Sequence, residues 1–242
     1  MLGKQKNAQR IIGILGGMGP EATSYLFQKI IEKTPARFDQ DHLRVIIDCN
    51  PKIPSRQAAI VGEGESPVPA MLTSGRTLVQ AGVHFIVISC VTAHYYLPQL
   101  RSELSVPFLS ILDETAAYVH RNYSGLQSVG LLAARASIST SLFQEAFLQK
   151  SVGCVLPDQE DQILVQEAIF EVKNRKSAER RNRIKSTLVD VAGRLIDQGA
   201  QGIVAGCTEI PLVLQQKDLP VPLFDVLDIL AAAAVLSALE ES

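Results

Sequence analysis

The chain has 242 residues, 47% of them hydrophobic, and a formal net charge of −2 at neutral pH. This length fits one large or two small domains with substantial cores. It contains no apolar run of about 18 residues, so no membrane-spanning segment is expected. Few aromatic residues and the absence of a long basic stretch give no reason to expect nucleic acid as a partner.

The cysteine pattern and the N-terminal segment bear on metal binding and location. The four cysteines lie far apart, without the Cys-x-x-Cys or Cys/His spacings of zinc sites, so no bound metal is expected. No apolar region precedes the first strand-like run, so no secretory signal is expected. We therefore expect a cytoplasmic protein with reduced thiols.

Short apolar runs rich in Val, Ile and Leu alternate along the chain with longer stretches that are compatible with helices. The runs do not alternate polar with apolar residues, which favours strands covered on both faces. Their order predicts doubly wound α/β domains with parallel sheets. A charged run, 173–185, is expected to be a solvated helix face or the join of two helices. The expected strands are 11–15, 45–48, 85–89, 108–111, 129–132, 203–205 and 223–224, and the expected helices are 21–33, 70–81, 138–150, 159–173 and 178–198.

The chain contains an internal repeat, and each copy ends in a cysteine. Residues 78–91 read LVQAGVHFIVISCV and residues 195–208 read LIDQGAQGIVAGCT, with Cys90 and Cys207 at matching positions. Further matches relate 12–17 to 129–134 and 105–109 to 220–224, which indicates a duplicated unit of roughly 115 residues. We expect two pseudo-symmetric domains, 1–106 plus 222–242 and 107–221, with the two cysteines facing each other across one cleft.

The Gly-rich segment 16–19 follows the first expected strand and precedes a helix. Its spacing is not the G-x-G-x-x-G of dinucleotide sites, so a nucleotide is the less favoured ligand. A nest of backbone N–H groups for a carboxylate at a helix N-terminus is the better interpretation. Because ligand clefts of open parallel sheets lie at the carboxyl ends of strands, we expect this segment to cluster with Asn50, Cys90, Arg135 and Cys207.

The cysteines divide into two classes. Lone cysteines are usually buried packing residues, and Cys49 and Cys154 are interpreted in that way. Cys90 and Cys207 are each followed within two residues by a threonine and precede a possible helix, where a thiol is biased toward thiolate and can act as a base. His94 and Glu209 are candidate partners of these thiols, although each type is more often a surface or capping residue.

Four motifs carry a resemblance to a known family: GILGGMGPEAT at 13–23, NPKIPSR at 50–56, SCVTAHYY at 89–96 and AGCTEIPLVL at 205–214. Together they resemble the aspartate racemase family of the PLP-independent aspartate/glutamate racemase superfamily. The resemblance covers nearly the whole chain. It implies two α/β domains with the active site between them, two cysteines as the acid–base pair, no metal or pyridoxal phosphate, and frequent homodimers.

The resemblance also implies which residues contact the substrate. Arg56 and, more loosely, Lys173 match residues that bind or polarise the substrate, and Met18 and Gly19 match the N-terminal substrate loop. The complete expected site comprises the catalytic residues Cys90 and Cys207 and the substrate-binding residues Met18, Gly19, Asn50, Arg56, Thr92, Arg135, Lys173, Thr208 and Glu209.

Two positions depart from the family pattern. The family usually has Asn after the first cysteine, in contact with the substrate, and this chain has Val91. The segment after Leu132 usually carries several threonines, and here it contains Arg135. These changes predict altered specificity and weak activity on aspartate, because unpaired polar groups in a pocket are costly. The alternative is that Val91 points away from the cleft and Arg135 lies on the surface.

The sequence predicts a cofactor-independent amino-acid racemase that interconverts L- and D-aspartate or a related acidic amino acid. One thiolate would remove the α-proton and the opposite thiol would deliver one to the other face. Fixed donors and cations must then stabilise the developing negative charge. The alternatives are an isomerase of a different carboxylate and a non-catalytic small-ligand binding protein, although binding alone would require neither thiol.

Overall fold

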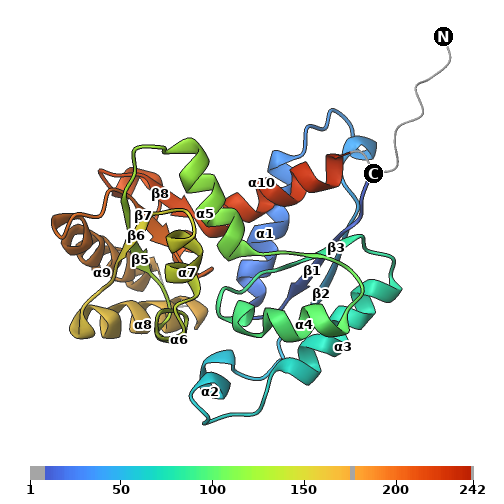
Figure 1. Cartoon of the computed structure of the whole chain (residues 1–242), viewed down its shortest axis with the longest axis horizontal. Coiled ribbons are helices and arrows are strands. Elements are labelled where there is room, and N and C mark those ends of the chain that lie inside the picture. Colours follow the sequence, from blue (N-terminus) through green and yellow to red (C-terminus); the bar gives the residue numbers. More distant parts are fainter. Residues whose placement is uncertain (1–8, 175–177, 241–242) are drawn as a thin grey trace.

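The computed structural model describes residues 9–174 and 178–240 and contains two four-stranded parallel sheets. The first sheet has the order β2-β1-β3-β4 and the second has the order β6-β5-β7-β8, so the two halves share one topology. They form the right and left lobes of Figure 1. The predicted α/β fold with parallel sheets is confirmed. The strands are β1 (Ile12–Gly16), β2 (Val45–Cys49), β3 (Phe85–Ile88), β4 (Phe108–Leu109), β5 (Ser128–Leu132), β6 (Gly153–Val155), β7 (Ile203–Ala205) and β8 (Leu223–Asp225).

Helices cover both faces of each sheet, and two of them, α5 and α10, lie between the lobes (Figure 1). The α-helices are α1 (Pro20–Lys33), α2 (Arg56–Ile60), α3 (Val68–Gln80), α4 (Leu97–Glu103), α5 (Ile111–Asn122), α6 (Arg135–Ser139), α7 (Leu142–Leu148), α8 (Gln159–Lys173), α9 (Ala178–Asp197) and α10 (Val226–Leu239). Short 3₁₀ segments are η1 (Asp39–Asp41), η2 (Thr92–Tyr96), η3 (Ile210–Leu212) and η4 (Gln216–Asp218).

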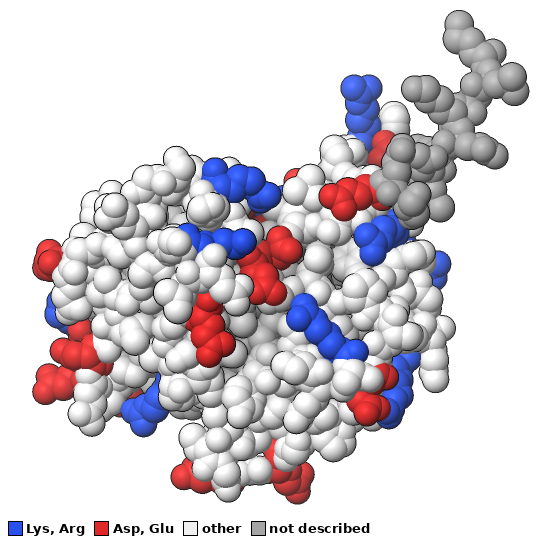
Figure 2. All heavy atoms as spheres, in the orientation of Figure 1, with Lys and Arg blue, Asp and Glu red and all other residues white. Residues whose placement is uncertain are grey.

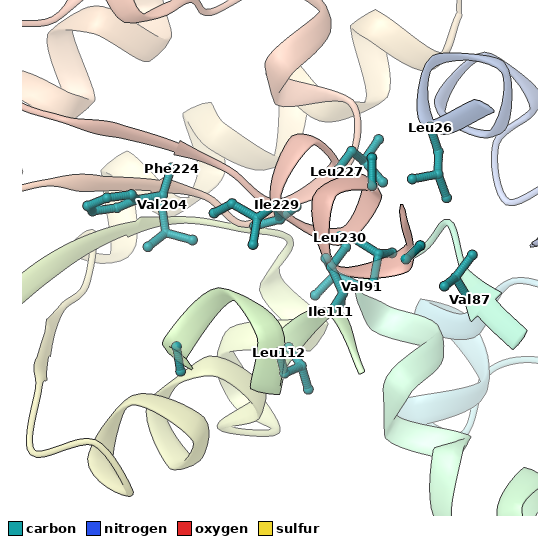
Figure 3. Close-up of a cluster of buried hydrophobic side chains, with 14 of the residues drawn as sticks. Leu26, Val87, Val91, Ile111, Leu112, Val204, Phe224, Leu227, Ile229 and Leu230 are labelled. Carbon is teal, nitrogen blue, oxygen red and sulfur yellow. The ribbon is translucent and has the colours of Figure 1, made fainter. Parts of the chain in front are cut away.

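Buried apolar side chains form three clusters, one outside each sheet and one between the sheets. Strand β3 shows the principle, because Phe85 and Val87 enter the central cluster while Ile86 and Ile88 enter the outer one. A strand that buries both faces is apolar at every position, which is why the alternating pattern was absent from the sequence. Figure 3 shows that the central cluster combines side chains from both halves with those of α5 and α10.

Helix α10 reads VLDILAAAAVLSAL and is apolar around most of its circumference. It packs against α1 and α5, so most of its surface is shielded from water. Asp225 caps it by accepting hydrogen bonds from the backbone N–H groups of Leu227 (2.9 Å) and Asp228 (3.1 Å). The Tyr25 hydroxyl donates to the same carboxylate at 2.8 Å, which ties α1 of the first half to the end of β8.

The strand pairing corrects the expected domain boundaries. β4 pairs with β3, and β8 pairs with β7, so residues 108–109 belong to the first sheet and residues 223–225 to the second. The boundaries after residues 106 and 221 assigned each of these strands to the opposite domain. Pro107 and Pro222 mark the starts of strands, and the chain crosses between the halves after those strands, through α5 and α10.

Two other expectations need adjustment, and a third agrees with the structure. The expected helix 138–150 is interrupted, because Ser141 has a left-handed φ of 55° and separates α6 from α7. The strand expected at 108–111 ends at Leu109, since the Ser110 side chain caps α5 by accepting from the Asp113 N–H. The charged run 173–185 does contain the join of α8 and α9, although residues 175–177 lie outside the described residues.

The remaining expectations concern the N-terminal segment, membrane helices and surface charge. Residues 1–8, where no secretory signal was expected, are not among the described residues. Within the described part of the chain, none of the helices is both long enough and apolar enough to cross a membrane. On the face shown in Figure 2, charges of both signs are scattered rather than gathered into a basic patch.

Candidate active site

A cavity of about 450 Å³ lies between the two halves. Its walls come from the segments that follow strands β1, β2 and β7 and from the C-terminal end of α8. The cavity therefore sits at the carboxyl ends of these strands, where ligand sites of this architecture occur. Five of the predicted substrate-binding residues, Met18, Gly19, Arg56, Lys173 and Glu209, line it. The other lining residues are Gly17, Pro20, Glu21, Pro51, Val172 and Leu212.

The loop between β1 and α1 forms one wall, and its conformation requires glycine. Gly17 has a φ of +91°, and a Cβ at this position would lie 2.3 Å from the carbonyl carbon of Asn50. The loop leads into the 14-residue helix α1, whose N-terminal end carries partial positive charge. Backbone N–H groups and the helix end therefore favour a negatively charged ligand group here.

Arg56 is held by backbone carbonyl groups. Its guanidinium donates to the carbonyls of Ile53 (3.1 Å), Pro54 (2.8 Å) and Met18 (3.3 Å). Its Nε is buried and has no hydrogen-bond partner among the described residues. No carboxylate in the described part of the chain forms an ion pair with this guanidinium, so Arg56 is a fixed cation with unused donors.

Glu209 provides the charged centre of the opposite wall. Its side chain is only 4% exposed, and its Oε1 lies 3.4 Å from the Lys173 ammonium. Its Oε2 accepts hydrogen bonds from the Cys207 thiol at 3.0 Å and the Thr208 hydroxyl at 3.2 Å. One buried carboxylate thus connects a cavity-lining cation to a buried thiol.

The environment of Cys207 corrects the expectation that this thiol is biased toward thiolate. Burial raises the pKa of Cys207 well above its ordinary value, and the negative charge of Glu209 raises it further. The following helix, η3, has only three residues, so it offers a small opposing dipole. Cys207 is therefore a protonated thiol at neutral pH.

Lys173 lies at the C-terminal end of α8, with a side chain 29% exposed. Burial lowers its pKa, but the charge of Glu209, and the charges that Cys207 and Cys90 carry when they are deprotonated, together raise the pKa above its ordinary value. The ammonium group would therefore stabilise either cysteine in its thiolate form.

Cys90 is the second residue after the end of β3 and is 6% exposed. His94 does not contact its thiol. Instead, Nε2 of His94 accepts from the Ile111 N–H at 3.1 Å, so Nδ1 must carry the proton and donate to the Cys90 carbonyl at 2.9 Å. Burial lowers the pKa of His94 to about 4, which keeps the ring neutral at physiological pH. His94 thus anchors the Cys90 backbone to the start of α5.

Four predicted substrate-binding residues lie away from the cavity lining. The Thr92 hydroxyl bonds the Ser137 hydroxyl of the other half at 2.9 Å. The Asn50 side chain accepts from the Lys52 N–H, within its own turn. Arg135 is exposed, and Thr208 is buried beside Glu209.

Val91 also differs from what the resemblance implied. It is 2% exposed and belongs to the central cluster. Figure 3 shows it among Ile111, Leu227 and Leu230. The side chain therefore packs in the core, as in the alternative in which Val91 points away from the cleft.

None of the four cysteines is among the residues that line the cavity: Cys90 and Cys207 are buried behind its wall, and Cys49 and Cys154 lie elsewhere. Cys49 is exposed rather than buried, because β2 is an edge strand. Cys154 is half-buried, and burial raises its pKa to about 12. No group of His, Cys, Asp or Glu suited to hold a metal ion occurs among residues 9–174 and 178–240.

Sequence reasoning missed part of the cavity wall. The missed residues are Pro20, Glu21, Pro51, Val172 and Leu212. Each is a close neighbour in sequence of a predicted residue, and this adjacency was the only signal that could have identified it. Glu21 also forms an ion pair at 3.3 Å with Arg181 of α9. This pair spans the two halves beside the cavity.

Comparison with known proteins assigns the chain to a family. A profile of the Asp/Glu/Hydantoin racemase family matches residues 15–234. The chain belongs to this family. As a racemase it is an isomerase, and its relatives support an amino acid as the substrate.

The relatives of this racemase differ in their reported substrates. The structure of an aspartate racemase from Picrophilus torridus is 30% identical, with a TM-score of 0.83, over 95% of this chain and 94% of that one. The broad specificity amino-acid racemase RacX of Bacillus subtilis (strain 168) is 25% identical over 231 residues, covering 93% of this chain and 96% of that protein. A glutamate racemase from Francisella tularensis, in complex with D-glutamate, shares the fold at 16% identity and a TM-score of 0.63, over 95% and 81% of the two chains.

Proposed function

We propose that this racemase interconverts the L- and D-forms of an acidic amino acid, aspartate first, by proton transfer between Cys90 and Cys207 without a cofactor. The observation that carries the proposal is the charged link at the cavity wall: Lys173 lines the cavity and lies 3.4 Å from Glu209, whose other carboxylate oxygen accepts a hydrogen bond from the Cys207 thiol. Two thiols near one cation, at equivalent strand ends of duplicated halves, suit a reaction that needs an acid and a base on opposite faces of one carbon.

Arg56 supports an acidic substrate. Three backbone carbonyls hold its guanidinium beside the cavity, and its charge has no carboxylate partner in the described part of the chain. Lys173, by contrast, is already paired with Glu209. A carboxylate on the substrate side chain would therefore bind Arg56, with the charge-assisted geometry that favours arginine.

The α-carboxylate would lie against the loop 17–19 and the N-terminus of α1. Removing the α-proton turns this group into an enediolate, whose extra negative charge needs donors that are already in place. The backbone N–H groups of the loop and the Lys173 ammonium are available for this role. The low exposure of Cys90 (6%) and Cys207 (7%) would strengthen these interactions by excluding water.

The hydrogen bond from Cys207 to Glu209 suggests how the two thiols divide the work. In the form shown, Cys207 holds a proton and would deliver it to the substrate carbon, while Cys90 would accept the α-proton from the opposite face. After one turnover the protonation pattern is reversed, and the enzyme is ready for the other enantiomer.

A broader substrate range is the second candidate. It is favoured by the similarity over nearly the whole chain to an amino-acid racemase of broad specificity. The cavity of about 450 Å³ also leaves room for side chains larger than that of aspartate. In this case the enzyme would act on other carboxylates with the same pair of thiols.

Location and assembly complete the proposal. We propose a cytoplasmic enzyme, because all four cysteines are free thiols. On the basis of the family resemblance we also propose a homodimer. Light scattering of the purified chain will test this assembly state. The apolar residues Leu236 (61% exposed) and Leu239 (40% exposed) on α10 are available for such a contact.

The decisive experiment follows exchange of the α-proton in D₂O. Both enantiomers of aspartate, glutamate, asparagine and alanine are incubated with the enzyme, and proton NMR and chiral chromatography measure exchange and inversion. Aspartate should exchange and invert, whereas asparagine, which has the same size without the carboxylate, should react far more slowly. No exchange with any acidic amino acid would overturn the proposal, and equal rates for aspartate and asparagine would remove Arg56 from its role.

A further inference from the structure

The Thr23 hydroxyl closes the loop that lines the cavity. Thr23 is 2% exposed and lies in the first turn of α1. Its Oγ1 accepts from the Gly17 N–H at 2.9 Å and donates to the Gly19 carbonyl at 3.0 Å. These two bonds join both ends of the loop around Met18, a residue whose own carbonyl accepts from Arg56.

The same hydroxyl also reaches the strand end that carries Cys90. Oγ1 of Thr23 lies 2.9 Å from Oγ of Ser89, which is fully buried and directly precedes Cys90. A hydroxyl has one proton and two lone pairs. One assignment satisfies every contact: Thr23 accepts from the Gly17 N–H and from Ser89, and it donates to Gly19. The hydrogen-bonding capacity of Thr23 is then fully used.

Gly16 makes this close approach possible. A Cβ on Gly16 would lie 2.4 Å from Cγ2 and 2.7 Å from Oγ1 of Thr23. A larger residue at position 16 would push the Thr23 side chain away from Ser89. The glycine that ends β1 and the threonine in the first turn of α1 therefore act as a matched pair.

Among the described residues of the second half, no equivalent junction occurs. The internal repeat aligns Thr23 with Thr140 and Ser89 with Gly206. The Thr140 hydroxyl donates to the carbonyl of Ala136 at 2.6 Å and lies 3.5 Å from that of Ser137, both within its own segment. Gly206 has no side chain to meet it. Thr140 thus holds the aligned position of the repeat, at the C-cap of α6, without connecting a loop to a cysteine, which makes it a control.

We propose that Thr23 is a positioning residue for racemisation: its single hydroxyl holds the loop 17–19 and the Cys90 strand end in one fixed arrangement. The proposal rests on the proposed function, since it takes Cys90 as one of the two bases. Without the hydroxyl the loop that receives the substrate and the residue that removes its proton can move independently. A displacement of about 1 Å at a reacting group can lower a rate roughly hundredfold.

The test compares Thr23→Val, which keeps the shape and removes the hydroxyl, with Thr23→Ser, which keeps the hydroxyl, and with Thr140→Val. We expect kcat of Thr23→Val to fall roughly 10- to 100-fold, with a smaller change in KM. Alkylation of Cys90 by iodoacetamide, followed by peptide mass spectrometry, should become severalfold faster as the strand end loosens. Thr23→Ser and Thr140→Val should stay within about twofold of the wild type on both measures.

Ser89→Ala provides an independent variant if Thr23→Val does not fold, because it removes only the contact to the strand end. It should raise Cys90 alkylation and lower kcat by an intermediate amount. If the wild type racemises and both Thr23→Val and Ser89→Ala behave like Thr140→Val, the positioning role is overturned and the proposed function stands. If no amino acid is racemised but the alkylation pattern follows expectation, the junction is real and the catalytic assignment of Cys90 is wrong.

Discussion

The loops after Cys90 and Cys207 occupy equivalent places in the duplicated fold, yet they are held in different ways. Around Cys90 the hydrogen bonds are between neutral groups: the His94 ring donates to the Cys90 carbonyl, and the Thr92 hydroxyl bonds the Ser137 hydroxyl. Around Cys207 the contacts are charged, through Glu209 and Lys173. Duplication has therefore supplied two similarly placed cysteines, and later divergence has given them unequal surroundings.

The residue after each cysteine shows the same divergence. Val91 packs in the apolar central cluster, whereas Thr208, at the matching position, donates a hydrogen bond to Glu209. Under the proposed mechanism, the first loop would fix the position of Cys90 and the second would control the proton of Cys207. A racemase must reach the same equilibrium from either enantiomer. The unequal surroundings of the two cysteines would therefore change the rates of individual steps and leave the equilibrium ratio of L- to D-amino acid unchanged.

The largest expected effect comes from removing either thiol. Cys90→Ala and Cys207→Ala should each lower the racemisation rate by roughly 10²- to 10⁴-fold or more, because each removes the acid–base group for one face. Exchange of the α-proton with solvent from one enantiomer should survive better than inversion, and deuterium incorporation measured separately for each enantiomer will show it. Cys49→Ala and Cys154→Ala are the controls and should be nearly neutral. Racemisation by either active-site variant at near the wild-type rate would return that cysteine to a packing role.

Glu209→Gln tests whether the second loop controls the proton. Burial still raises the pKa of Cys207 in this variant, but the contribution from the charge of Glu209 is lost, so the pKa should fall. The limb of the pH–rate profile at which Cys207 loses its proton should therefore move to lower pH. We expect kcat/KM for aspartate to fall about 10- to 100-fold at neutral pH, since a hydrogen bond to a charged group is worth about 1.5–3 kcal/mol.

Thr208→Val is the control for that measurement, because it removes a hydrogen bond to Glu209 and leaves the carboxylate charge in place. Its pH–rate profile should keep the wild-type position. If Glu209→Gln changes the rate without moving the profile, Glu209 has a purely structural role, and the proposed asymmetry between the two cysteines is incorrect.

The smallest expected effect on catalysis comes from Val91→Asn. The side chain lies in the central cluster, so an amide would be buried there without a partner. We expect a loss of about 1–3 kcal/mol in the free energy of unfolding, measured by urea denaturation, and no gain in kcat/KM for aspartate. A variant with wild-type stability and improved aspartate turnover would show instead that position 91 faces the substrate, as the family pattern implies.

Much of the fold was predictable because strands buried on both faces leave an unmistakable apolar run. The strand 203–205 and the helix 159–173 coincide with β7 and α8. Helix α10 was not predicted, because it packs against helices on opposite sides and so has no polar face to produce a periodic pattern. The short strand β6 was also missed, since three residues give too little pattern to recognise.

The candidate site was predictable where motifs mark it and unpredictable where only packing decides. Arg56, Lys173 and Glu209 were expected and do line the cavity. The direction of the Val91 side chain depends on the twist of the backbone after β3, which residue type does not reveal. The hydrogen bond between Cys207 and Glu209 reversed the expected thiolate bias, because burial and a neighbouring carboxylate outweigh a very short helix.

The central cluster has a consequence for folding and motion. The cluster contains side chains from both sheets, so each half depends on the other to bury its inner apolar face. Separating the halves would expose this apolar surface to water. Heat should therefore unfold the molecule in one cooperative transition rather than lobe by lobe. Wide hinge opening would break the same cluster, so substrate should enter through small local movements at the rim, where the Glu21–Arg181 ion pair spans the halves. We therefore expect the two halves to move as one body, with access to the cavity controlled at its rim.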